Sequence, residues 1–358
     1  MLSENKTFGD GPYALALPEI LLQILEELDT RNLMNAALVC KVWTWPAVDV
    51  GWRTCSIRLS SVLAPLLKCK PLQLRGCDQS EAWDEAEREE IPTERWRQYQ
   101  LNYGAKVTIV TCDITPDDSF NSRLERLVGS HGGPICPHLR NLTFSVHTEN
   151  DGEEDVDRWS PFLSLLVSST LSRVRLSIGN VTRRVATESI EVLARIAPRI
   201  QHVFIENWAE FSINYSAFRC MKNLKVQGHI GHAGWRSLAD CPQLERVVLR
   251  DILEIDLQQQ NYSVSLPHLR TLSVGGSFEY ASADFTLMLF QNTIMPMLGT
   301  LEVSIREPNV TIRNAVQGEI LKFLRRRSLV LKEVVINGRV MPGYDDITPG
   351  SLDHYVDY

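Results

Sequence analysis

The sequence lacks the common catalytic signatures. Its 358 residues contain no G-x-x-x-x-G-K-[ST] phosphate loop, no G-x-G-x-x-G turn, no H-E-x-x-H pair and no G-x-S-x-G elbow. It also lacks a run of about 18 apolar residues, which a membrane-spanning helix needs. A basic segment ahead of an apolar core, which begins a secretory signal, is missing too. We therefore expect a protein of the cytoplasm, the nucleus or both, without an active site of its own.

Paired cysteines are also missing. The eight cysteines are widely spaced and include no C-x-x-C pair, so we expect reduced thiols and no disulfide, metal or other cofactor. His229 and His232 lie close together in GHIGHAG, but the glycines favour a turn over a metal site. The net charge of −7 gives no general reason to expect binding to nucleic acid or to a membrane.

The most informative feature is a short apolar helical segment at residues 17–53. Pro18 suits the first turn of a helix, Asp29 can cap a second helix, and Pro46 is expected to end that second helix. The apolar positions at helical spacing are Ile20, Leu21, Ile24, Leu25, Leu28, Leu33, Ala36, Ala37 and Cys40, with Leu38, Val39 and Trp43 extending the surface. A segment this small needs a partner surface, which the rest of this chain or another protein could supply.

The order of the residues distinguishes these two possibilities. The segment contains, in this order, LP, E, I, a Leu-Asp break, L, VCKxW and WR. This order of residues resembles the F-box. In F-box proteins this three-helix module binds the Skp-type adaptor of a cullin-RING ubiquitin ligase. Many F-boxes have LPxE where this chain has LPE, and Asn32 stands where an acidic residue is common.

The resemblance implies which side chains would contact the adaptor, although some of them must form the core of the module instead. The implied contacts are Leu17, Pro18, Ile20, Ile24, Leu28, Leu33, Val39, Cys40 and Trp43. The implied partners are a Skp-type adaptor and, through it, the cullin and RING subunits.

The second feature is an L-x-x-L-x-L pattern that returns about every 20 to 35 residues from residue 136 onward. Alternation within each copy predicts a strand with one buried row, and residues 188–196 and 317–326 predict helices between copies. The copies are Leu139/Leu142/Phe144, Leu171/Val174/Leu176, Ile200/Val203/Ile205, Met221/Leu224/Val226, Leu244/Val247/Leu249, Leu269/Leu272/Val274, Leu298/Leu301/Val303 and Leu331/Val334/Ile336.

One strand and one helix cannot bury their own apolar face, but a stack of such units can. The pattern resembles irregular leucine-rich repeats, which implies a solenoid with a curved parallel sheet inside and helices outside. It lacks the family's usual Asn or Cys after the last apolar position. An α/β domain with similar strands but no solenoid is the alternative.

The expected fold class is α/β, with an N-terminal three-helix F-box followed by an irregular leucine-rich-repeat solenoid. Between the two, a helix is expected near residues 93–103 and a strand near residues 107–110. The expected divisions are a flexible N-terminus at 1–14, the F-box-like docking module at 15–55, a linker region with possible degenerate repeats at 56–135, the solenoid at 136–343 and a flexible acidic tail at 344–358.

Residues that flank the last two apolar positions of each copy should point outward from the sheet. Neighbouring strands lie about 4.8 Å apart, so basic residues from different copies can share one patch. These residues are Arg173, Arg175, Lys225, Arg246 and Arg250. Arginine suits carboxylate and phosphate groups, so we hypothesise that an acidic or phosphorylated protein segment binds there. A solvated basic strip without a ligand is the alternative.

Together these features predict a non-catalytic substrate-recognition subunit of an SCF-type (Skp-cullin-F-box) ubiquitin ligase. The F-box end would bind the adaptor, and the repeat end would capture a protein substrate. The competing function is a leucine-rich-repeat scaffold whose N-terminal helices only cap the repeats. A secreted recognition protein would need a signal sequence.

Overall fold

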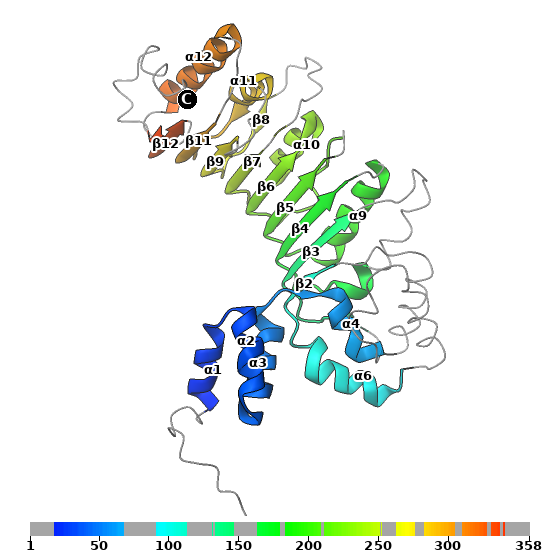
Figure 1. Cartoon of the computed structure of the whole chain (residues 1–358). Coiled ribbons are helices and arrows are strands. Elements are labelled where there is room, and N and C mark those ends of the chain that lie inside the picture. Colours follow the sequence, from blue (N-terminus) through cyan, green and yellow to red (C-terminus); the bar gives the residue numbers. More distant parts are fainter. Residues whose placement is uncertain are drawn as a thin grey trace, which may run out of the picture. The chain divides into compact units, whose positions relative to one another are not determined.

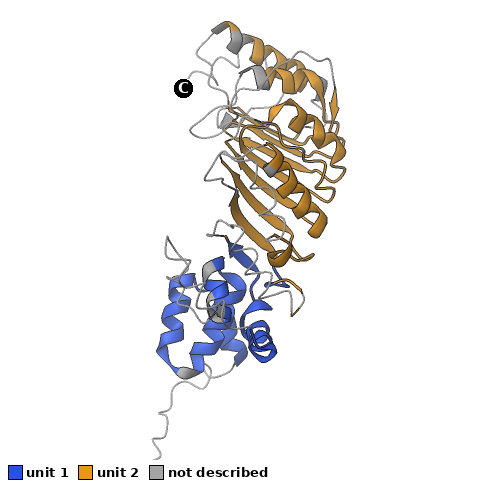
Figure 2. Cartoon of the chain, turned by 90° about the vertical axis from the view of Figure 1, so that its right-hand side faces the viewer, with its two compact units in different colours: residues 1–111, 135–139 blue, residues 112–134, 140–358 orange. Residues whose placement is uncertain are grey.

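The computed structural model of the chain (Figure 1) divides into two compact units (Figure 2). The first unit comprises residues 1–111 and 135–139, and the second comprises residues 112–134 and 140–358. The structure describes residues 18–67, 91–112, 131, 133–146, 163–179, 183–208, 211–250, 252, 263–275, 283–304, 310–327, 331–336 and 339–340. The predicted flexible ends at 1–14 and 344–358 lie outside the described residues.

Three helices open the first unit. They are α1 (Pro18–Glu26), α2 (Thr30–Val39) and α3 (Lys41–Thr54). As predicted, Asp29 caps α2, because its carboxylate accepts a hydrogen bond from the backbone N–H of Asn32 at 2.8 Å. This bond satisfies one of the N–H groups that the first turn of a helix leaves without a partner.

The prediction that Pro46 ends the second helix is wrong. The second helix ends at Val39, because Cys40 adopts an extended backbone with φ −160° and ψ 164°. Pro46 lies inside α3, which continues to Thr54. A proline removes one backbone N–H from a helix, and here burial of Ala47 and Val50 in the core offsets that loss.

The three helices share a small apolar core. Its buried residues are Leu21, Leu25, Leu33, Ala36, Ala47 and Val50, and its partly buried ones are Leu22, Leu28, Ala37, Trp43 and Cys55. Burying one leucine side chain contributes about 1.5–3 kcal/mol. Packing of this kind is what stabilises helices too short to persist alone in water.

A strand pair and further helices complete the first unit. They are β1 (Ile57–Arg58), α4 (Leu59–Leu67), α6 (Thr93–Tyr99), η3 (Gln100–Gly104) and β2 (Ile109–Thr111), and β1 pairs with β2 in parallel. The helix near residues 93–103 and the strand near 107–110 are thereby confirmed. The Asp49 carboxylate of α3 forms ion pairs with Arg53 at 2.6 Å and with Lys106 at 2.5 Å, which ties α3 to the segment before β2.

The second unit contains a mostly parallel sheet. Its strands, in their order across the sheet, are β3 (Asn141–Val146), β4 (Arg173–Ile178), β5 (His202–Asn207), β6 (Asn223–Gly228), β7 (Arg246–Arg250), β9 (Thr271–Val274), β11 (Thr300–Val303), β12 (Glu333–Ile336) and β13 (Arg339–Val340). Neighbours pair in parallel except that β13 runs antiparallel to β12. Each predicted L-x-x-L-x-L copy contains one of the strands β3 to β12.

The strands pair without a shift in register. Leu142 lies beside Val174, Val174 beside Val203, and the same position continues through every copy to Val334. The apolar row is buried throughout. The prediction of one strand in each copy, with alternate side chains in the core, is therefore confirmed.

Helices cover one face of this sheet, as Figures 1 and 2 show. They include α9 (Arg183–Ile196), α10 (Gly231–Ser237), η5 (Leu238–Asp240), α11 (Ala283–Asn292) and α12 (Val310–Arg327), and a short parallel pair is formed by β8 (Val264–Ser265) and β10 (Thr293–Ile294). The helices predicted at 188–196 and 317–326 lie within α9 and α12. Because the helices occupy one face, the other face carries the half-exposed side chains of each strand.

The segment GHIGHAG is more ordered than a turn, which corrects the prediction. Gly228 and Gly231 have positive φ angles of 93° and 59°, and α10 begins at Gly231. The helix forms because Trp235 is fully buried within the unit, where its indole N–H donates to the Thr293 hydroxyl at 3.1 Å. Burial of one large side chain thus outweighs the low helix propensity of the glycines.

Candidate functional site

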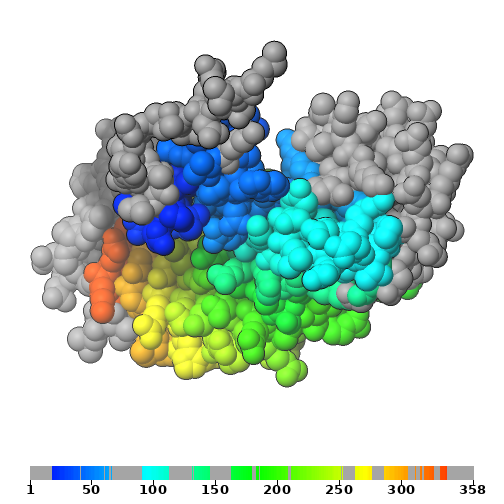
Figure 3. Space-filling view, turned by 90° about the horizontal axis from the view of Figure 1, so that it is seen from below, coloured from blue at the N-terminus to red at the C-terminus, as the bar shows by residue number. Residues whose placement is uncertain are grey.

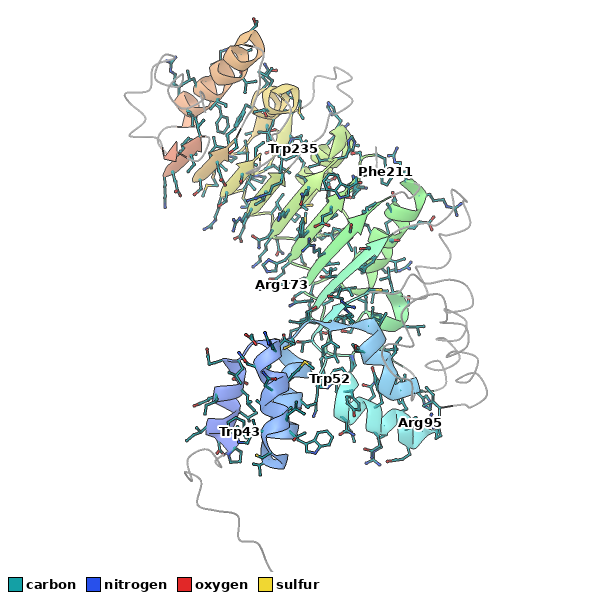
Figure 4. The ribbon with its side chains drawn as sticks, in the orientation of Figure 1. Trp43, Trp52, Arg95, Arg173, Phe211 and Trp235 are labelled. Atoms are coloured by element: carbon teal, nitrogen blue, oxygen red, sulfur yellow. The ribbon has the colours of Figure 1, made fainter. Side chains whose placement is uncertain are left out.

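The first candidate surface consists of exposed apolar side chains on α2 and α3. Their exposed fractions are 68% for Met34, 84% for Leu38, 66% for Val39, 59% for Val42 and 67% for Trp45. We refer to these five residues as the apolar surface. Single exposed apolar residues are ordinary, but a group gathered within residues 34–45 is typical of an interaction site. The side chains of α1 to α3 are drawn in Figure 4, and Figure 3 shows part of these helices in blue at the molecular surface.

The predicted adaptor contacts fall into three groups. Pro18, Ile20, Val39 and Cys40 are exposed, and Ile24, Leu28 and Trp43 are partly buried. Leu33 is only 3% exposed and is one of the residues that form the core of the module instead of its surface. Leu17 lies outside the described residues.

The apolar surface also contains residues that the resemblance did not assign as contacts. Met34 and Leu38 lie one helical turn apart on α2 and face away from the buried Leu33 and Ala36. Their spacing is a signal in the sequence, but it does not tell which of two apolar faces is buried. The break at Cys40 decides this, since it turns α3 so that Ala47 and Val50 reach the core.

The second candidate surface lies on the face of β4 to β7 opposite the described helices. It carries Arg173, Arg175, Lys225, Arg246 and Arg250, which we call the basic strip. Arg173, Arg175 and Arg246 are exposed, and Lys225 and Arg250 are half-buried. Arg173 is labelled in Figure 4, on the side of the sheet away from the helices. The structure therefore brings the predicted basic residues onto one face, on β4, β6 and β7.

Phe204 of β5 lies at the centre of the basic strip. The Arg175 guanidinium lies 4.5 Å from the centroid of its ring, and the Lys225 ammonium lies 4.2 Å from it. Arg175 also donates a hydrogen bond to the Glu206 carboxylate. Cation–π contacts of this kind hold a charged group in place by about 0.5–1 kcal/mol at exposed sites. Two cations of the strip are thus positioned by an aromatic ring that the sequence analysis did not single out.

His202 borders the strip beside Arg173. Partial burial lowers the pKa of His202 below its usual 6.5, and the charges of Arg173 and Lys222 lower it further. The side-chain amide of Asn223 lies 3.1 Å from Nδ1 of the ring. If the amide nitrogen donates this bond, the neutral ring keeps its proton on Nε2. The positive charges around His202 favour an anion at this edge of the strip.

Two further features limit the chemistry of the described residues. Within the ranges given above, no three His, Cys, Asp or Glu side chains gather closely enough to hold a metal ion. None of the helices in the described part of the chain has the length and hydropathy to cross a membrane.

The comparisons with known proteins bear on the first surface. No curated protein matches this chain. A protein-family model described as F-box-like matches residues 18–58. These residues span α1, α2, α3 and β1, and they include the whole apolar surface. The N-terminal helical segment of this chain is accordingly an F-box-like domain.

Proposed function

We propose that this chain is the substrate-recognition subunit of an SCF-type ubiquitin ligase. The observation that carries the proposal is an F-box-like domain that exposes five large apolar side chains. Through this surface, together with Pro18, Ile20 and Cys40, the chain would bind a Skp-type adaptor. The adaptor would in turn connect it to the cullin and RING subunits.

The physical argument for docking is the free energy of burial. Removing apolar surface from water contributes about 25 cal/mol per Å², and tryptophan is enriched among the residues that dominate binding energy. Trp45 and Leu38 are 67% and 84% exposed, so a partner could bury most of both side chains. A scaffold whose N-terminal helices act only as a cap would gain nothing from keeping these side chains in water.

For residues 136–343 we propose an irregular leucine-rich-repeat solenoid. Its support is the unbroken parallel register of strands that return about every 20 to 35 residues, with the described helices on one face (Figure 1). In a solenoid each repeat packs mainly on its neighbours, which leaves a long open face for a ligand.

The proposed capture surface is the basic strip, and its proposed ligand is a protein segment with acidic or phosphorylated residues. Arginine forks pair with carboxylate and phosphate groups, and Arg173, Arg175 and Arg246 are exposed. The chain itself would then catalyse no bond formation. It would raise the local concentration of the substrate near a ubiquitin carrier bound by the other subunits.

The first test is co-purification of the full chain with a Skp-type adaptor. The test variant is Leu38→Asp with Val42→Asp, which places two charges on the apolar surface without touching the core. We expect wild type to form a stable one-to-one complex and the variant to lose it, with at least about a hundredfold loss of affinity from two buried charges.

The matched control is Leu101→Asp. Leu101 is 57% exposed, close to the 59% of Val42, and lies in η3 of the same unit but beyond residues 18–58. This variant should bind the adaptor like wild type. Absence of a complex with folded wild-type protein would overturn the proposed function and leave a repeat scaffold as the better description.

A further inference from the structure

Charge is distributed unevenly across the face of the sheet opposite the described helices, which we call the open face. The basic strip supplies five positive side chains on β4, β6 and β7, against the single carboxylate of Glu206 on β5. On β9 the outward side chains are Thr271 and Ser273, which are neutral. Two more glutamates of this face follow on the next two strands, Glu302 on β11 and Glu333 on β12. The face therefore changes from positive to negative along the direction that crosses the strands.

The two glutamates belong to this face by register. Leu301 and Val334 lie side by side and are buried, so the residues on either side of them in β11 and β12 point the other way. The Ser273 hydroxyl donates a hydrogen bond of 2.7 Å to the Glu302 carboxylate, which holds that side chain over β9 and β11. Glu333 is exposed.

The distance between the positive and the negative strands suits a polypeptide ligand. Neighbouring strands are about 4.8 Å apart, so β7 and β11, separated by β9, lie about 10 Å apart. About three residues of extended chain cover that distance. Positive and negative groups at this separation can engage one peptide simultaneously, whereas a small anion could contact only one of them.

We propose that the open face binds a protein segment of polarised charge, with an acidic block over β4 to β7 and a basic block over β11 and β12. The segment crosses the strands, because the sign of the charge changes in that direction. This inference rests on the proposed function in taking the open face as the capture surface. The inference adds to the proposed function the order of charges along the ligand.

Glu206 on β5 should also affect binding of the acidic block. Its carboxylate already bonds Arg175, whose side chain is 51% exposed. An acidic block must compete with this internal carboxylate. Removing the charge by Glu206→Gln should therefore raise the affinity for an acidic block by about two- to fivefold.

The test uses two synthetic peptides of identical composition and net charge, measured against the full chain by fluorescence anisotropy at low salt. The block peptide is EEEEGSGKKKK, and the alternating peptide is EKEKGSGEKEK. We expect the block peptide to bind about tenfold more tightly, since several surface ion pairs of modest strength add together. Raising the salt concentration should reduce this difference.

Charge reversal then tests each end of the face. Arg173→Glu with Arg246→Glu should abolish the preference for the block peptide. Glu302→Lys with Glu333→Lys should also abolish it, while increasing the affinity for the uniformly acidic peptide EEEEGSGEEEE. The matched control, Glu191→Lys with Glu319→Lys on helices α9 and α12, should change neither affinity.

Equal binding of the block and alternating peptides, or of neither, would overturn the inference. So would tighter binding of EEEEGSGEEEE than of the block peptide to wild type, because the ligand would then be simply acidic. The adaptor experiment tests the proposed function independently of the peptide experiment. Adaptor binding without a preference for the block peptide would support the proposed function but not the inference. A preference for the block peptide without adaptor binding would support only the inference.

Discussion

Gly228 is the last residue of β6 and Gly275 directly follows β9, with φ angles of 93° and 99°. A Cβ atom at Gly228 would lie 2.1 Å from the carbonyl oxygen of Asn207, and one at Gly275 would lie 2.1 Å from that of Ser304. Both obstacles are backbone atoms of the neighbouring strand segment. These two positions therefore require glycine for their conformation and for the close approach of the chains.

Substitution of either glycine should destabilise the second unit. We expect Gly228→Ala and Gly275→Ala to lower the free energy of unfolding by about 2–4 kcal/mol each, from strain at positive φ and backbone overlap. Urea unfolding measures the change. The control is Gly318→Ala in α12, where a Cβ meets nothing within 4 Å; there we expect a gain of about 0.5–1 kcal/mol. Equal effects at all three sites would contradict this account.

His202 predicts a dependence of stability on pH. Burial and the charges of Arg173 and Lys222 lower its pKa in the folded chain below the usual 6.5. Between the lowered pKa and 6.5 the unfolded chain binds more protons, so the free energy of unfolding falls as the pH falls through this window. Above it, His202 adds no pH dependence.

The measurement is the urea midpoint from pH 5 to pH 7.5, in wild type and in His202→Gln. Other histidines cancel in the difference, and the variant should lose less stability on acidification. A small difference is expected because the ring is only partly buried. A wild-type chain that loses less stability than the variant would show that the sign is wrong.

At the scale of the element, α2 divides two tasks between adjacent residues. Leu33 is 3% exposed and packs in the core, whereas Met34 is 68% exposed on the apolar surface. The helix period makes this possible, since neighbouring side chains point in directions about 100° apart. One face of α2 thus stabilises the F-box-like domain while another is available to a partner.

Alanine substitution should separate these tasks. Leu33→Ala leaves a cavity and should cost about 2–5 kcal/mol of stability. Met34→Ala should change stability by less than about 0.5 kcal/mol. It should weaken adaptor binding, because it removes a side chain that the adaptor would bury. Thermal unfolding and adaptor titration of both variants test the division. An unfolding effect of Met34→Ala as large as that of Leu33→Ala would refute it.

At the scale of the whole molecule, the two proposed binding events rest on different forces. Adaptor docking would depend on burial of the apolar surface, which is insensitive to salt at moderate concentration. Peptide capture would depend on exposed charges, which salt screens over about 10 Å at 0.1 M ionic strength. The two surfaces also belong to different compact units of the chain.

This difference predicts independent responses. Raising sodium chloride from about 0.05 M to 0.5 M should weaken block-peptide binding about tenfold or more and change adaptor affinity by less than about threefold. Leu38→Asp with Val42→Asp should leave peptide affinity unaltered, and Arg173→Glu with Arg246→Glu should leave adaptor affinity unaltered. Isothermal titration of each variant with each ligand checks both statements. Parallel losses would mean that the two surfaces are coupled.

Local patterns in the sequence predicted the strands of the repeated copies and several helices of this fold. Each L-x-x-L-x-L copy contains one of the strands β3, β4, β5, β6, β7, β9, β11 and β12, because alternation along a strand is a property of the strand itself. The Asp29 cap likewise depends on residues only three apart. The basic strip was predictable for the same reason, since identical positions in each copy must share a face once the strands are in register.

Other features depended on contacts between residues far apart in the sequence. The break at Cys40, the path of α3 through Pro46 and the burial of Leu33 all follow from how three helices share one core. Helix α10 forms in a glycine-rich segment because Trp235 meets Thr293, 58 positions away. Phe204 anchors Arg175 and Lys225 only because β4 and β6 flank β5.

By itself, then, the sequence determined the strands of the L-x-x-L-x-L copies, the helices predicted within α9 and α12, which residue types line each face, and that residues 17–53 resemble the F-box. The tertiary structure alone decided which of two apolar faces of α2 is buried and which charges lie together on the sheet. The physical reason is that periodicity acts over a few residues, whereas burial and charge pairing depend on distances between segments that folding brings together.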